Sequence, residues 1–214
     1  MVIKEFTIPY KSLSDIIKIK PIPDVHWGNT YCDKKAFRQF IADKEAYYIG
    51  IGDLFDAIIP TDFKRYELHG DDTKKPDAVD SYVNQLTALL KPLAESGHII
   101  GLGSGNHESK FLKQNGTSLM GRLCHNLNCL HFGFSWLLRL VFIPSKYITK
   151  SGAGRRRSII IRGHHGWGGG SRTQGGDLTK YSKDVAYWDA DIFLYGHVHR
   201  LQDDEIPRLG LSNM

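Results

Sequence analysis

Four short clusters of potential metal ligands each follow directly on an apolar run of this 214-residue chain. A polar cluster after an apolar run is expected where a buried strand passes into a loop. The carboxyl ends of neighbouring parallel strands meet at one edge of a sheet, so ligands placed there can converge. The sequence therefore predicts an α/β protein with a metal site along one sheet edge. The clusters are Asp24-Val25-His26, Gly52-Asp53-Leu54-Phe55-Asp56, Gly105-Asn106-His107-Glu108 and Gly196-His197-Val198-His199.

The composition is that of an ordinary globular protein. Apolar residues make up 41% and charged residues 24% of the chain, which excludes disordered and fibrous classes. Because no proline-rich or serine-rich linker divides it, we expect a single domain over residues 1–214. The longest apolar stretch, residues 132–143, is interrupted by Ser135 and Arg139 and is too short for a bilayer of about 30 Å. No membrane segment is expected.

The cysteines and the N-terminus favour a cytoplasmic protein. Cys32, Cys124 and Cys129 are an odd number without framework spacing, which is typical of a reducing compartment. The N-terminus lacks the continuous apolar core of a secretion signal. The net charge of +5 permits phosphate-rich partners such as nucleic acid but does not require them. The sequence does not identify a protein partner.

Strand patterns alternate with helix patterns between the clusters, which is typical of an α/β fold. Strands are expected over residues 16–25, 46–51, 98–102, 158–162 and 191–195. Helices are expected over residues 33–44, 77–95, 118–126 and 178–188. Residues 130–143 predict one or two longer strands of antiparallel kind, and residues 58–76 a polar loop. Asp33 is the expected N-cap of its helix.

The order of the motifs resembles that of the calcineurin-like metallophosphoesterase superfamily. The order is Asp-x-His, Gly-Asp-x-x-Asp, Gly-Asn-His-Glu, His-Gly and Gly-His-x-His, and it extends from Asp24 to His199. The resemblance implies a two-sheet β-sandwich flanked by helices, the four-layer α/β/β/α fold. Since only residues 200–214 follow His199, that fold is expected to be short at its C-terminus. The implied activity is hydrolysis of a phosphoester by attack of a metal-bound hydroxide.

The resemblance also implies a set of ligands for two divalent metal ions. Asp24, His26 and His199 would hold the first ion, and Asn106, His197 and one histidine of the His164-His165 pair would hold the second, with Asp53 bridging both. His165 is preferred because Gly166 follows it, as glycine follows the family's histidine, while His164 stays an alternative. Mixed nitrogen and oxygen ligands suit manganese, the preferred metal, or iron or zinc.

Further roles follow from the same resemblance. His107 would protonate the leaving group or stabilise the transition state. Asp56 and Glu108 would be carboxylates that orient imidazoles. The glycine-rich segment 166–176 could hold a substrate phosphate through its backbone amides and Arg172, with His164 as another possible contact, or it could be a lid without direct contact.

The residues around the second and third clusters favour a phosphodiester as substrate. Protein phosphatases of the superfamily carry arginines directly after the second cluster and just before the third. This chain has Ala57 and Gly103-Ser104 there, so the clamp for a monoester dianion is missing. We therefore expect a nuclease-like enzyme or a nucleotide phosphodiesterase. A small-molecule or phosphoprotein phosphomonoesterase is the alternative enzyme, and a non-catalytic metal-binding scaffold or accessory subunit is the alternative of another class.

Overall fold

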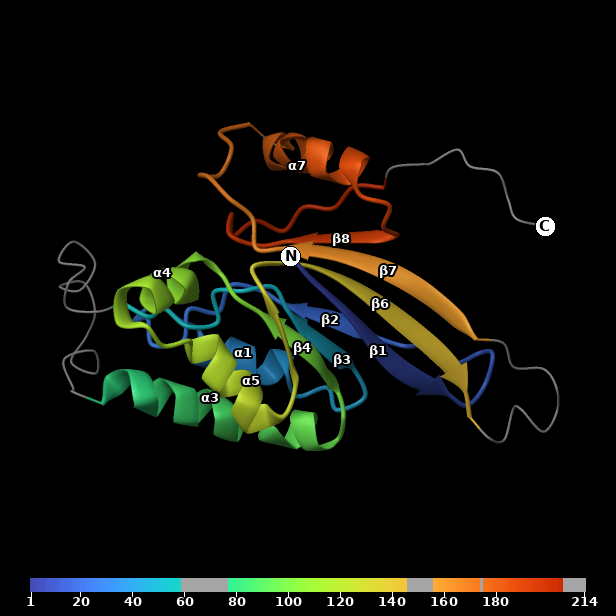
Figure 1. The fold of residues 1–214 in the computed structure, drawn as a ribbon, viewed down its shortest axis with the longest axis horizontal. Coiled ribbons are helices and arrows are strands. Elements are labelled where there is room, and N and C mark those ends of the chain that lie inside the picture. The colour runs from blue at the N-terminus through green and yellow to red at the C-terminus, as the bar shows by residue number, and fades with distance from the viewer. Residues whose placement is uncertain (59–76, 146–155, 174, 206–214) are drawn as a thin grey trace.

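The computed structural model describes residues 1–58, 77–145, 156–173 and 175–205. Two four-stranded sheets and five helices lie in these ranges, which confirms a mixed α/β protein (Figure 1). The first sheet has the order β1 (Val2–Tyr10), β6 (Ser135–Pro144), β7 (Arg157–His164) and β8 (Ile192–Tyr195). The second has the order β2 (Ile19–Ile22), β3 (Tyr47–Gly50), β4 (Ile99–Gly103) and β5 (Leu130–Gly133). The helices are α1 (Lys34–Phe40), α3 (Ala78–Glu95), α4 (Asn106–Asn115), α5 (Leu119–Leu127) and α7 (Gly176–Tyr187).

All strand pairs of the second sheet are parallel, so its strands end at one common edge. β3 illustrates why this sheet is apolar on both faces. Tyr48 belongs to the core beneath the helices, whereas Ile49 belongs to the core between the sheets. Successive side chains of a strand point to opposite faces, so a strand covered on both sides needs a continuous apolar run.

The two sheets pack face to face over a shared apolar core. Trp136 and Leu138 of the first sheet and Ile100 and Phe132 of the second are buried in it. The rings of Phe132 and Trp136 stack with centroids 4.7 Å apart. Gly163 of β7 makes room for this pair, because a Cβ at that position would overlap the Trp136 indole. This packing fixes the carboxyl ends of β7 and β8 relative to those of the second sheet.

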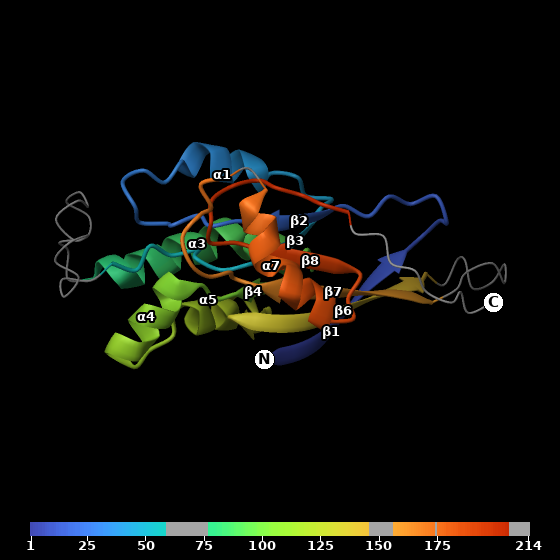
Figure 2. The ribbon, with the colours of Figure 1, turned by 90° about the horizontal axis from the view of Figure 1, so that it is seen from above.

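Helices pack against both sheets. Leu86 and Leu90 of α3 and Leu123 of α5 are fully buried in the core that also contains residues of α1. α7 lies on the opposite side of the two sheets (Figures 1 and 2). There Asp184 accepts a hydrogen bond of 2.7 Å from the Tyr195 hydroxyl and pairs with Arg162 at 3.2 Å. No helix among the described residues is long and apolar enough to cross a bilayer.

Most predicted elements are confirmed. Asp33 caps α1 by accepting a 2.8 Å hydrogen bond from the Ala36 amide, although α1 ends at Phe40 and not at residue 44. α3 covers the predicted helix almost completely and includes Pro92 near its end. The strands predicted at 46–51, 98–102, 158–162 and 191–195 correspond to β3, β4, β7 and β8, and the helices at 118–126 and 178–188 to α5 and α7.

Four elements differ from the prediction. β1 was not expected, because Lys4 and Glu5 interrupt the apolar pattern on the exposed part of this edge strand. α4 was not expected either, and only β2 forms within residues 16–25. Residues 130–143 divide near Gly133, which has a φ of +68°. The antiparallel expectation holds for β6 against β7 but is wrong for β5, which pairs parallel to β4. From residue 59 on, the predicted polar loop lies outside the described residues.

Candidate metal centre

The predicted ligands follow the carboxyl ends of five strands. Asp24 and His26 come after β2, Asp53 after β3, Asn106 after β4, His165 after β7, and His197 and His199 after β8. The structure brings their ligand atoms together in three overlapping groups, each with all its ligand atoms within 4.8 Å of one another. The groups are Asp24, His26 and His199; His26, Asp53 and His107; and Asp53, His165 and His197. Asp53 and His26 each belong to two groups.

The backbone at these positions is unusual. His26, Asp53, His197 and His199 have φ values of 49°, 49°, 74° and 51°. Each non-glycine residue in this region costs on the order of 1–3 kcal/mol and persists only where its surroundings enforce it. In the described chain the other two non-glycine residues with positive φ are Ala57 and Asn128. Backbone strain is therefore concentrated on predicted ligands, as is typical of functional sites.

Two glycines allow the loops after β3 and β4 to approach closely. A Cβ on Gly105 would overlap the Asp53 carboxylate. A Cβ on Gly52, whose φ is +114°, would lie 2.6 Å from His165 Nδ1 and 2.7 Å from the Gly105 amide nitrogen. Packing therefore requires glycine at positions 52 and 105, which begin the second and third clusters.

His165 is held with one nitrogen facing the site. Its Nδ1 lies 3.1 Å from the carbonyl oxygen of Ile51, which can only accept, so the neutral imidazole carries its hydrogen on Nδ1. Its Nε2 lies 3.1 Å from Asp53 Oδ2 and 3.0 Å from Asn106 Oδ1. A histidine whose outer nitrogen donates to a backbone carbonyl is a common arrangement for a metal ligand.

The Asn106 amide tests whether the donor set fits a cation. Asn106 Oδ1 lies 3.1 Å from Asp53 Oδ2, 3.0 Å from His165 Nε2 and 2.7 Å from His197 Nδ1. When both imidazoles are neutral and present these nitrogens unprotonated, all three neighbours are acceptors, so without a cation the amide nitrogen would be better suited to this position. With a cation among these atoms the amide oxygen would be the ligand. The donor set therefore fits a metal ion.

In the first group, too, hydrogen bonding turns one imidazole nitrogen toward another predicted ligand. His26 Nε2 and His199 Nε2 lie 3.2 Å apart, and His26 Nδ1 lies 3.3 Å from Asp56 Oδ1. With its hydrogen on Nδ1, neutral His26 directs a lone pair at His199. Asp24 accepts a hydrogen bond from the backbone amide of His197, with its two oxygens at 3.0 and 3.1 Å. Asp24 thus ties the loop after β2 to the loop after β8.

Charge is balanced around the buried Asp53 carboxylate. Burial alone would raise the pKa of Asp53, but the hydrogen bond and charge of His165 lower it to about 2. Burial alone would lower the pKa of His165, but the hydrogen bond and charge of Asp53 outweigh it and raise this pKa. The pKa of His26 is also raised, because the bond to Asp56 and the surrounding carboxylates outweigh burial. Asp53 therefore stays ionised. At His26 and His165, protons compete with a metal for the ring nitrogens.

His107 lies beside the first group and is oriented by Asp56. Its Nδ1 lies 2.6 Å from the Asp56 carbonyl oxygen and 3.6 Å from Asp56 Oδ1. Its backbone amide donates to Asp53 Oδ1 at 2.9 Å, and its ring stands edge-on to that of His26 with centroids 4.6 Å apart. Burial lowers the pKa of His107. Asp56 therefore contacts both His26 and His107, as expected for a carboxylate that orients imidazoles.

Glu108 has a different role from the expected one. Its carboxylate is 2% exposed and accepts backbone hydrogen bonds from Asp53 at 3.1 Å, Gly105 at 2.8 Å and Phe55 at 2.9 Å. Burial and the Asp53 charge raise the pKa of Glu108 to about 7. Glu108 thus ties the backbone of the loop after β3 to the first turn of α4. We had expected Glu108 to orient an imidazole instead.

His164 and Arg172 lie apart from the ligands. The His164 ring packs edge-on against Phe134 and Trp167, and its Nδ1 accepts from the Gly166 amide at 2.8 Å. Burial lowers the pKa of His164 to about 4. Arg172 is exposed, and in the part of the chain that the structure describes we find no hydrogen bond or ion pair from it to a proposed ligand. The geometry therefore favours His165 over His164 as the ligand.

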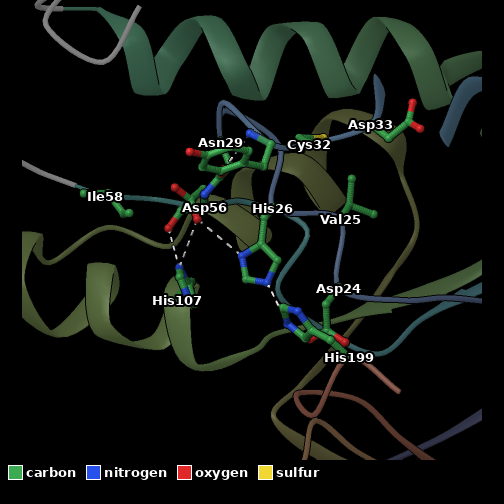
Figure 3. A pocket seen from close by; sticks show the side chains of 11 residues that line it. Asp24, Val25, His26, Asn29, Cys32, Asp33, Asp56, Ile58, His107 and His199 are labelled. Carbon is green, nitrogen blue, oxygen red and sulfur yellow. Dashed lines mark hydrogen bonds and ion pairs between the residues drawn. The ribbon is translucent and has the colours of Figure 1, made fainter. Parts of the chain in front are cut away.

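A pocket of about 560 Å³ opens beside the first group (Figure 3). Its lining includes predicted site residues: Asp24, His26, Asp56, His107 and His199. It also includes residues that the sequence analysis did not assign to the site: Val25, Asn29, Tyr31, Cys32, Asp33 and Ile58. Most of these follow directly on the first cluster in the sequence. Proximity to that cluster was the available signal, but nothing in their residue types distinguishes them from an ordinary loop.

Glu108→Gln is expected to weaken metal binding. The substitution replaces one carboxylate oxygen by an NH2 group that faces a backbone donor, which costs about 1–3 kcal/mol for the lost acceptor. Since Glu108 positions Asp53, we expect an about 10–100-fold weaker affinity for Mn²⁺ by titration calorimetry. Glu95→Gln, at an exposed position of α3, is the control. Equal affinities of the two variants would contradict the positioning role.

Metal affinity is expected to rise with pH. His26 and His165 have raised pKa values in the metal-free protein, so they keep protons to a higher pH than free imidazole does. A metal needs their neutral form, and binding releases these protons. Each released proton should strengthen Mn²⁺ binding about ten-fold per pH unit below the pKa. Calorimetry in two buffers of different ionisation enthalpy counts the protons, and binding between pH 6 and 8 without proton release would contradict this assignment.

Comparison of the chain with protein-family models, with curated proteins and with solved structures found no match.

Proposed function

We propose that this chain is a phosphodiesterase that depends on two divalent metal ions and belongs to the calcineurin-like metallophosphoesterase superfamily, with its four-layer α/β/β/α fold. The observation that carries the proposal is the position of Asp53. Its carboxylate is 1% exposed and is shared by a group with His26 and His107 and a group with His165 and His197, and His26 also belongs to the group with Asp24 and His199. A carboxylate between two sets of ligands is what a dinuclear site needs as its bridge.

The donors divide into two sets around this bridge. The first ion would be held by Asp24, His26 and His199, the second by Asn106, His165 and His197, and Asp53 would bind both. Four imidazoles with carboxylate and amide oxygens suit manganese, iron or zinc better than magnesium, and manganese is the metal that we favour. When bound, two such ions neutralise phosphoryl oxygens and lower the pKa of a water to near neutrality.

The chain's own residues supply the proton for the leaving group. His107 is held at Nδ1 by the Asp56 carbonyl, so Nε2 is the atom that exchanges a proton with substrate. Because burial lowers the pKa of His107, its protonated form gives up that proton readily. Asp56 fixes His107 and His26 together, and Glu108 fixes the backbone that carries Asp53.

The charge of the pocket supports a diester over a monoester. Among the described residues no lysine or arginine lines it, whereas Asp24, Asp33 and Asp56 do. A monoester dianion needs cationic groups in addition to the metals, while a diester carries one negative charge at phosphorus. Ala57 and Ser104 occupy positions where protein phosphatases of the superfamily would place arginine. The substrate class that fits best is a nuclease-type or nucleotide phosphodiester.

The substrate class is tested with a bis-aryl phosphodiester and the matching aryl phosphomonoester. Metal-stripped protein resupplied with Mn²⁺ should prefer the diester, and Asp53→Asn should reduce kcat by orders of magnitude with an unchanged circular-dichroism spectrum. A preference for the monoester would contradict the diester assignment, and near-normal turnover by Asp53→Asn would contradict the bridge. If protein that has bound metal hydrolyses neither substrate, the non-catalytic scaffold would be favoured. A diester preference would justify assays with single-stranded and double-stranded DNA.

His107→Asn is expected to keep the metals but lose rate. General acid catalysis contributes typically about 10²–10⁴-fold, and most for leaving groups that need the proton. The variant should therefore lose more kcat on a diester with an alkyl leaving group than on one with a nitrophenolate. A loss of equal size on both substrates would rule out the general-acid role.

A further inference from the structure

The pocket lies on one side of the proposed metal centre. It is lined by the first group and by His107, but Asn106, His165 and His197 are not part of its lining in the described chain. If His107 protonates the leaving group, as the proposed function holds, the group that departs must be within reach of His107. The leaving group of the substrate therefore occupies this pocket, and the inference below rests on the proposed function.

The pocket lining includes an exposed aromatic ring. Tyr31 is 90% exposed, and Val25, Cys32 and Ile58 belong to the same lining. A turn fixes the backbone of Tyr31: its amide donates to Asn29 Oδ1 at 2.8 Å, and the Cys32 amide donates to the Asn29 carbonyl at 3.1 Å. An aromatic ring exposed to water in the lining of a site is available for stacking with a base or an aryl group.

The charges of the pocket restrict what else the leaving group carries. The charged residues of its described lining are Asp24, Asp33 and Asp56, apart from any protonated histidine. Asp24 would be neutralised by the first ion, but Asp33 and Asp56 are not proposed ligands and would repel a leaving group that bore a further phosphate. Asp33 caps α1 through Oδ1, which leaves Oδ2 as an acceptor for an amino group or hydroxyl of the leaving group.

We propose that this pocket binds the leaving alcohol of the substrate, that this alcohol is a nucleoside without a further phosphate, and that Tyr31 stacks on its base. A water oxygen forms the new bond to phosphorus and gives one proton to solvent, the bond between phosphorus and the ester oxygen breaks, and that ester oxygen takes the proton from His107. The substrate class is therefore a phosphodiester between nucleosides, as in a dinucleotide or a nucleic acid end. Pyrophosphate-linked substrates, whose leaving group is a phosphate, do not fit.

The catalytic test compares a thymidine dinucleotide, which releases a nucleoside, with bis(2,2,2-trifluoroethyl) phosphate, which can release only an alcohol without a base. The ratio of kcat/KM for the two substrates should fall about ten-fold in Tyr31→Ala, mainly through KM, since stacking on one aromatic ring contributes on this scale. Tyr31→Phe should keep the wild-type ratio. Tyr187→Ala, which removes another exposed tyrosine on α7, is the matched control. Tyr31 is so exposed that its loss should not disturb folding.

A binding test separates this inference from the proposed function. Thymidine binding to metal-free Asp53→Asn protein, followed by saturation-transfer NMR, should be weakened about ten-fold by the additional Tyr31→Ala change. Thymidine 5′-phosphate should bind less tightly than thymidine to the same metal-free protein. Tyr31-dependent binding without any diester hydrolysis would overturn the proposed function but support the pocket. Asp53-dependent hydrolysis with a ratio and thymidine binding insensitive to Tyr31 would overturn the pocket assignment alone.

Discussion

The structure depends on keeping the carboxylate of Asp53 ionised although it is almost completely buried. Asp53 is 1% exposed, and its charge is compensated by His165 at 3.1 Å and His26 at 4.0 Å. An uncompensated buried charge would be strongly destabilising, so the surrounding loops must bring cationic or metal partners to it. Gly52 and Gly105 allow that approach, and Glu108 holds the backbone around it. The proposed ligands follow the carboxyl ends of five strands, which belong to two packed sheets.

The convergence of the proposed ligands could be predicted because their placement needs only residue type and strand ends. Asp24, Asp53 and His197 each follow an apolar run, and the carboxyl ends of parallel strands converge regardless of how the strands are covered. The preference for His165 over His164 depended on the glycine that follows it. The structure provides a physical reason for this choice, since His164 faces Phe134 and Trp167 while His165 faces Asp53.

Other features depend on tertiary contacts that have no local sequence signal. β1 is an edge strand whose Lys4 and Glu5 face solvent, so its alternation is weak. The chain turns at Gly133 between β5 and β6, which belong to different sheets. The backbone role of Glu108 arises from two loops that are remote in sequence. Tyr31 lines the same pocket as His107, a placement that residue type alone does not reveal.

The central claim is that Asp53 bridges two metal ions, and anomalous diffraction from crystals grown with Mn²⁺ tests it most directly. The account predicts two anomalous peaks about 3.5–4 Å apart, with the Asp53 carboxylate between them. The peak nearer Asp24 should contact His26 and His199, and the other should contact Asn106, His165 and His197. A single peak, or peaks away from Asp53 under metal-replete conditions, would contradict the dinuclear site.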